Sequence, residues 1–128
     1  MAIRRQGKEP RRRTGHFVLR GDMDIRVIGN AEEAAKLLRR HVRDATGIVL
    51  GNSPEGVVMV THEPAMRGLG EEGYALLVSS HAVMLRAATP AGLLNAVEQF
   101  RRLLSAGGTV TAADLTHLTA PAVAPAWM

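Results

Sequence analysis

The sequence predicts an α+β fold: a mostly antiparallel β-sheet with two α-helices packed on one face. Only two segments show helical periodicity, one over 31–45 and one that opens at Thr89 and stops before Gly107. The other apolar runs are short, β-prone and mostly joined by turns, which favours antiparallel pairing. The chain has 128 residues, 46% of them hydrophobic, so it is long enough to bury one self-sufficient core.

The expected strands are short and rich in Val, Ile and Leu. They cover 17–20, 25–28, 48–50, 57–61, 73–78, 82–87 and 109–111. The runs 73–78 and 82–87 are separated only by the turn 79–81, so they should form an antiparallel hairpin. The chain beyond the second helix has no clear period apart from the run at 109–111.

The first helix is predicted over 31–45, with apolar residues at i, i+3 and i+4 spacing. Asn30 is the expected N-cap, and Glu33 three residues later would complete a capping box. Gly47 is expected to end the helix. His41 lies on the apolar face, where we expect it to donate a hydrogen bond to a backbone carbonyl.

The second helix is predicted to begin with Thr89 as N-cap and Pro90 at its first position. Gly92 lies inside this helix, and we expect it to allow close packing of the helix against a strand. Together with Ala96 and Gln99, Gly92 forms a strip of small and polar residues beside the apolar stripe. We expect this helix to serve for docking or self-association.

The positive charge is concentrated at the N-terminus. Residues 1–13 contain one acid, Glu9, and six basic residues: Arg4, Arg5, Lys8, Arg11, Arg12 and Arg13. This is a net charge of 6 − 1 = +5, whereas the whole chain carries 16 − 12 = +4 and residues 14–128 therefore carry −1. We expect 1–14 to be a disordered basic tail whose six cations could contact a polyanion. No aromatic residue lies between the arginines, which argues against recognition of single-stranded nucleic acid.

Composition excludes several classes of protein. The chain has no cysteine, which excludes disulfides, thiolate nucleophiles and sulfur-ligated metal sites. No apolar stretch approaches the roughly 18 residues needed to span a bilayer, so no membrane role is expected. The basic start is followed by an apolar run that stops at Arg20, too early for an export signal. As written, the chain is expected to be cytoplasmic.

One short motif suggests a zinc site. His62 and Glu63 resemble the start of a His-Glu-x-x-His helix, but position 66 is Met and Pro64 would break such a helix. The other histidines have no i, i+3 or i+4 spacing among them. We therefore expect no metal ligands and no cofactor.

Two further groups of residues are candidates for a catalytic role. Glu63, Glu71 and Glu72 share a loop and could form a carboxylate pair, but nothing in the sequence shields them from water. Ser79, Ser80 and His81 form the hairpin turn, where a nucleophile would lack an orienting group. We expect no catalytic residue among them.

A family resemblance lies in the second half of the chain. Its residues are the strand Glu72–Val78, the returning strand with its Ala-Thr-Pro-Ala-Gly-Leu continuation over 83–94, and the helix end Phe100–Leu104. This pattern resembles the N-terminal accessory domain of family 20 glycoside hydrolases, the β-N-acetylhexosaminidases. The resemblance implies a zincin-like α+β domain over 15–120, followed by an irregular tail or linker over 121–128.

The resemblance also implies a function. In this family a separate (β/α)₈ barrel carries out catalysis with an Asp-Glu pair and covers the two helices of the accessory domain. The adjacent acids of this chain, Glu32-Glu33 and Glu71-Glu72, do not form such a pair. We therefore expect a non-catalytic scaffolding domain whose partner is a barrel or another chain. The alternative is a binding module, for polyanions through the basic tail or for glycans through the sheet.

Overall fold

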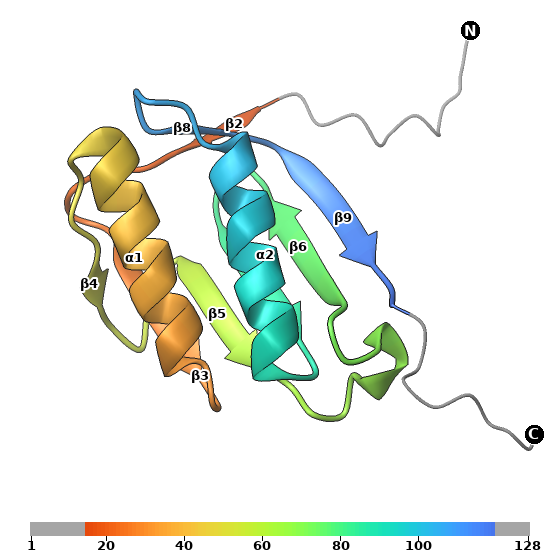
Figure 1. Cartoon of the computed structure of the whole chain (residues 1–128). Coiled ribbons are helices and arrows are strands. Elements are labelled where there is room, and N and C mark those ends of the chain that lie inside the picture. The colour runs from red at the N-terminus through yellow and green to blue at the C-terminus, as the bar shows by residue number, and fades with distance from the viewer. Residues whose placement is uncertain (1–14, 120–128) are drawn as a thin grey trace, which may run out of the picture.

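Residues 15–119 are described by the computed structural model of the chain, and they form two helices lying side by side on one face of a β-sheet (Figure 1). Helix α1 covers Glu32–Thr46 and helix α2 covers Pro90–Leu103. The α+β class with both helices on one face is therefore confirmed. The predicted tails 1–14 and 121–128 lie outside the described residues, so the proposed domain boundaries stay predictions.

The strands form one large sheet and one small one. The six-stranded sheet has the order β4-β3-β5-β7-β6-β9, and β2 pairs with β8 in a two-stranded sheet. The bounds are β2 His16–Val18, β3 Asp24–Ile28, β4 Gly51–Asn52, β5 Val58–His62, β6 Tyr74–Val78, β7 Val83–Ala87, β8 Thr109–Thr111 and β9 Ala113–His117. A short 3₁₀ helix, η2, covers Arg67–Leu69 between β5 and β6.

The strand pairing is mixed. The predicted hairpin is present, because β6 pairs antiparallel with β7; β6 with β9 and β2 with β8 are antiparallel as well. In the other half of the large sheet, β3 pairs parallel with β4 and β5, and β5 pairs parallel with β7. Strands β3 and β5 can pair parallel because helix α1 connects them. Strands β5 and β7 can pair parallel because β6, which lies between them in the chain, runs antiparallel to β7 on its other side.

Several element ends follow local chemistry. Gly47 ends α1 with a φ of 81°, and its N–H donates to the Arg43 carbonyl at 2.8 Å, as predicted. The N-cap of α2 is Thr89, also as predicted. The predicted capping by Asn30 is wrong: α1 begins at Glu32 with Ala31 as N-cap, so Asn30 lies one residue too early to cap it.

Two strand predictions also need correction. The run 48–50 is not a strand; the short edge strand β4 follows it at 51–52. Strand β9 was missed altogether, although polar Asp114 and Thr116 alternate with Ala113 and Leu115, which is a period-two pattern.

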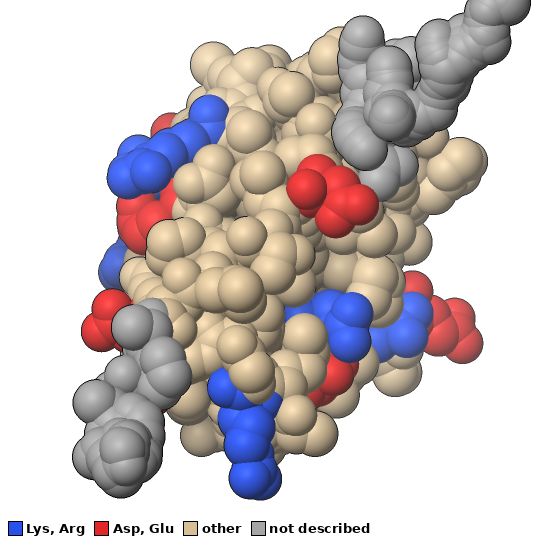
Figure 2. All heavy atoms as spheres, turned by 90° about the vertical axis from the view of Figure 1, so that its right-hand side faces the viewer, with Lys and Arg blue, Asp and Glu red and all other residues tan. Residues whose placement is uncertain are grey.

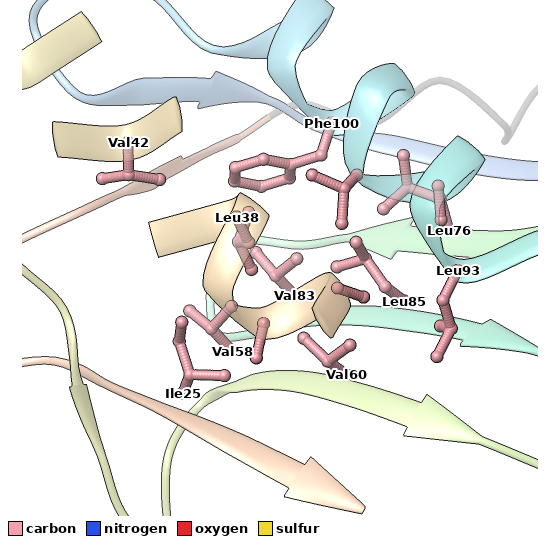
Figure 3. Close-up of a cluster of buried hydrophobic side chains, with 14 of the residues drawn as sticks. Ile25, Leu38, Val42, Val58, Val60, Leu76, Val83, Leu85, Leu93 and Phe100 are labelled. Carbon is pink, nitrogen blue, oxygen red and sulfur yellow. The ribbon is translucent and has the colours of Figure 1, made fainter. Parts of the chain in front are cut away.

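The core lies between the helices and the large sheet (Figure 3). Along β6 and β7 every second residue is buried, which is the pattern of strands with one face against a core. Each helix contributes large side chains that are at most 1% exposed. The main members are Ile25, Leu38, Val42, Val58, Val60, Leu76, Val83, Leu85, Leu93 and Phe100.

Candidate functional site

Hydrogen bonds tie the start of α2 to the loop before β6. The Thr89 hydroxyl accepts from the Gly92 N–H at 3.0 Å and donates to the Glu71 carbonyl at 2.5 Å. The Asn95 side-chain amide donates to the Glu72 carbonyl at 3.0 Å. The N-cap and a side chain of the second helical turn thus donate to carbonyls of a loop that is distant in sequence. These residues belong to the segment that resembles the accessory domain, and their role is structural.

Gly92 has no room for a side chain. A Cβ at this position would overlap the carbonyl oxygen of Gly73 and lie 2.9 Å from the Ala87 Cβ. Gly92 is buried, with the chain before β6 on one side and the end of β7 on the other. The prediction that Gly92 allows close packing of helix and strand is confirmed.

The strip that the sequence offered for docking is largely inside the molecule. Gly92 and Ala96 are buried and Gln99 is half-buried, so this strip is not the part of α2 that a partner could contact. The 3.6-residue period of the helix turns Gly92 and Ala96 towards the sheet, where they are buried. Self-association through α2 stays a prediction, and it would have to use the exposed side of the helix around Leu94, which is 37% exposed.

His62 braces the backbone rather than offering a metal ligand. Its Nδ1 accepts from the Asn30 N–H at 3.3 Å, and its Nε2 lies 3.1 Å from the Ala88 carbonyl oxygen, to which it donates. One nitrogen accepts and the other donates, which is the pattern of a neutral imidazole. Among residues 15–119, no group of three or more His, Cys, Asp or Glu side chains could hold a metal ion.

The loop acids do not form a carboxylate pair. The two oxygens of the Glu63 carboxylate each lie 3.2 Å from a guanidinium nitrogen of Arg86, in a half-buried ion pair between the end of β5 and β7. Glu71 and Glu72 have exposed side chains, and their carbonyls bind α2. The structure therefore pairs Glu63 with Arg86 and leaves the side chains of Glu71 and Glu72 exposed to solvent.

Glu98 joins the two helices. Its carboxylate accepts from Arg101 at 2.8 Å and lies 3.1 Å from Nε2 of His41, so the prediction that His41 binds a backbone carbonyl is wrong. The hydrogen bond from Arg101, assisted by the one to His41, lowers the pKa of Glu98 below its ordinary value of 4.5, although burial acts in the opposite direction. A general acid at neutral pH needs a raised pKa, so Glu98 is unsuited to that role.

We expect Glu98→Gln to lower the free energy of unfolding at pH 7 by well under about 1 kcal/mol, because the side chain is 41% exposed. The folded-state pKa is lowered, so the carboxylate contributes its stability above the unfolded value and loses it as the pH falls through the folded value. The difference from the wild type, measured by urea unfolding, should therefore shrink as the pH is lowered from 7 into the acid range. Glu55→Gln, on an exposed turn, is the control. A loss that stays the same as the pH is lowered would contradict this assignment.

A hollow of about 490 Å³ opens where β3 and β5 begin, beside β2 and the hairpin turn. Its charged and polar lining comes from His16, Arg20, Asp22, Asp24, Glu55, Ser80 and His81. All of these side chains are exposed or half-exposed. Ser80 Oγ lies 3.1 Å from Nδ1 of the adjacent His81, but both are in solvent, where such a pair is not activated.

The predicted polyanion contacts cannot be placed. Arg4, Arg5, Lys8, Arg11, Arg12 and Arg13 all lie outside the described residues, so this role stays a prediction. In the part of the chain that the structure describes, neither helix is long and apolar enough to cross a membrane. Seen from the β9 side, charged side chains are scattered around a mainly uncharged centre (Figure 2), so this side has no extended basic patch.

Comparison with known proteins identifies the family. The sequence profile described as "Glycosyl hydrolase family 20, domain 2" matches residues 8–118. The chain belongs to this family. Membership of glycosyl hydrolase family 20, domain 2, confirms the resemblance found in the sequence, and with it an accessory rather than a catalytic domain of hexosaminidases. No curated protein matches the chain.

Solved structures of family 20 enzymes share the fold. An inactive mutant of the exo-β-N-acetylglucosaminidase from Vibrio harveyi matches with a TM-score of 0.72 and 19% identity, over 82% of this chain and 17% of that one. A mutant β-hexosaminidase from Streptomyces plicatus, in complex with the product GlcNAc, matches with a TM-score of 0.72 and 23% identity, over 81% and 23%. The family 20 domain 2 chain therefore spans about a fifth of the length of these enzymes.

Proposed function

We propose that this chain is a non-catalytic accessory domain that supports a family 20 catalytic domain not contained in it. The observation that carries the proposal is the match to domain 2 of the family over residues 8–118. The acids support it as well: Glu63 is held by Arg86, and the pKa of Glu98 is lowered by Arg101. Neither carboxyl has the surroundings of a catalytic acid.

The exposed side of α2 is the better candidate for the surface that meets the catalytic domain. The outer face of α1 carries Glu32, Lys36, Arg40 and Arg43, all exposed, and burying such charges without partners is expensive. The first half of the outer side of α2 instead presents Ala91, Leu94 and Asn95, which carry no charge. The charged residues of this side, Glu98, Arg101 and Arg102, lie in its second half. Leu94 is 37% exposed and is the largest apolar side chain of the three.

A complementation experiment tests this proposal. The chain alone should not cleave a chromogenic N-acetylglucosaminide. Added in excess to a family 20 catalytic domain from which domain 2 has been removed, it should raise the thermal midpoint of that domain by about 5 °C, because a bound partner stabilises the folded state. Leu94→Glu should abolish the shift, since it places a charge in the contact. Arg40→Glu, on the outer face of α1, should leave it unchanged.

Two results would overturn the proposal. One is turnover by the chain alone that is lost when a single acid is replaced. The other is a catalytic domain whose midpoint the wild-type chain does not shift at any ratio. If Arg40→Glu abolishes the effect and Leu94→Glu does not, α1 rather than α2 makes the contact.

A further inference from the structure

The hollow where β3 and β5 begin carries a net negative charge. Its lining includes three acids, Asp22, Asp24 and Glu55, and one arginine, Arg20. With the two histidines of the lining neutral, one base and three acids give 1 − 3 = −2. Arg20 is already paired with Asp22, because its Nε lies 3.4 Å from Oδ1 of that residue. The hollow therefore has more carboxylates than it has cations to balance them.

Asp24 is the acid of this hollow that gains most from a cation. It is half-buried at the start of β3, and a Cβ at Gly51 would overlap its Oδ1, so backbone packs directly against the carboxylate. Within residues 15–119, this carboxylate accepts no hydrogen bond and joins no ion pair. A partly buried carboxylate without a partner is costly, and a cation bound from the open side of the hollow lowers that cost.

The apolar part of the lining suits the stem of an arginine side chain. Val18 is 49% exposed, and Met23 and Val57 are half-buried in the same hollow. Arginine packs its methylene groups along apolar surface while its guanidinium reaches a polar group. Its planar guanidinium also matches both oxygens of a carboxylate. An apolar wall beside the Asp24 carboxylate is therefore a site that fits an arginine.

The basic N-terminal segment joins the described residues at the wall of this hollow. A Cβ at Gly15 would lie 3.3 Å from the Cβ of Ser80, and His16 and Ser80 both line the hollow. Residues 1–13, with six basic residues and one acid, precede this point. A chain spans at most about 3.6 Å per residue, so the backbone of residues 11–13 lies within about 15 Å of Gly15 in any conformation.

We propose that the hollow binds the basic segment 4–13 of its own chain, with an arginine from 11–13 paired to Asp24. Its guanidinium pairs with the Asp24 carboxylate, and its stem lies along Val18, Met23 and Val57. The charges are complementary, since residues 1–13 carry +5 and the hollow carries −2. The segment contains five arginines and one lysine, which agrees with a site that favours a planar cation.

The short tether makes a contact within one chain stronger than the same contact between two chains. An exposed ion pair adds little to binding by itself. A short linker, however, raises the effective concentration of the attached segment to about the millimolar range. Salt screens such exposed charges, with a Debye length of about 8 Å at physiological ionic strength and about 3 Å at 1 M. The contact should therefore be intramolecular and should be lost at high salt.

A spin label on the full chain tests the proposal. Because the chain has no cysteine, Gln6→Cys gives a single site for a nitroxide and leaves the charge of the segment unchanged. The nitroxide should broaden the amide NMR signals of 22–24, 55–57 and 80–81, but not those of η2, which lies beyond the other end of β5. Asp22→Asn with Asp24→Asn brings the charge of the hollow to about zero and should reduce this broadening by about threefold or more. A salt concentration of about 1 M should have the same effect.

Glu71→Gln with Glu72→Gln is the matched control. It removes the same two charges, but from exposed side chains before β6, far from the hairpin turn of the hollow, and should leave the broadening unchanged. The dispersed amide signals of each variant show that it is folded. Equal broadening in the wild type and in the Asp22→Asn, Asp24→Asn variant would overturn the proposal, because attachment of the segment alone would then account for it. Broadening in a mixture of spin-labelled chain and unlabelled chain would also overturn it, because the segment would then bind a second copy. Neither result bears on complementation of the catalytic domain.

Discussion

Phe100→Ala is expected to lower the free energy of unfolding by about 3–5 kcal/mol, the range for removing a buried aromatic ring from a well-packed core. Phe100 is fully buried, and its ring reaches from α2 towards Val42 of α1 and the sheet (Figure 3). Its removal leaves a cavity where three elements meet. For a domain whose total stability is of the order of 5–15 kcal/mol, this is a large share.

Urea unfolding followed by circular dichroism measures this loss. The midpoint should fall while the slope stays constant, since the surface exposed on unfolding hardly changes. Leu94→Ala, on the exposed side of the same helix, is the matched control and should cost much less, because its side chain is already 37% exposed. Similar losses for the two variants would mean that α2 does not pack with this face against the sheet.

Elements with a local signal were predictable from the sequence. Helix α2 begins at Thr89 and Pro90 because a hydroxyl cap and a proline at the first position act within one turn. Gly47 ends α1 for an equally local reason, its positive φ. The hairpin of β6 and β7 was predictable because only a short turn separates two apolar runs.

The parallel half of the sheet was not predictable in the same way. Strand β7 follows β6 in the chain, yet it pairs parallel with β5 on its other side. Neither the length nor the composition of β7 tells an edge strand from a central one. Strand β9 had an alternating pattern, but it is exposed over most of its length and lacks the hydrophobic content of the other strands. The order of strands in a sheet depends on pairing between segments that are distant in the chain, and a single sequence contains little information on that pairing.

The side-chain contacts of the candidate site also divide into those that a local sequence pattern predicts and those that depend on long-range pairing. Pro64 and Met66 showed from the sequence alone that His62 does not begin a zinc helix. The actual partners of His62 are Asn30 and Ala88, at separations of 32 and 26 residues, and no local pattern specifies them. Similarly, Arg86 and Glu63 meet only because β5 and β7 are neighbours.

Gly92→Ala is expected to destabilise the fold by about 2–3 kcal/mol, even though alanine is the better helix former by about 1 kcal/mol. The added methyl group would overlap the Gly73 carbonyl oxygen, which belongs to backbone that cannot move without shifting the start of β6. Gly68→Ala is the matched control, because a Cβ at Gly68 meets nothing within 4 Å, and it should change stability by less than about 0.5 kcal/mol.

Whether Gly92→Ala lowers or raises the free energy of unfolding shows what the Thr-Pro-Ala-Gly motif does in this chain. Thr89, Gly92 and Asn95 all act on the short loop before β6, two of them through hydrogen bonds and one through the space it leaves. A loss of stability in urea unfolding would show that the motif holds a helix close to a strand, which is the task of a scaffold. Stabilisation by about 1 kcal/mol, the intrinsic preference of alanine, would mean that this close approach does not exist. The resemblance to the accessory domain would then need a reason other than packing.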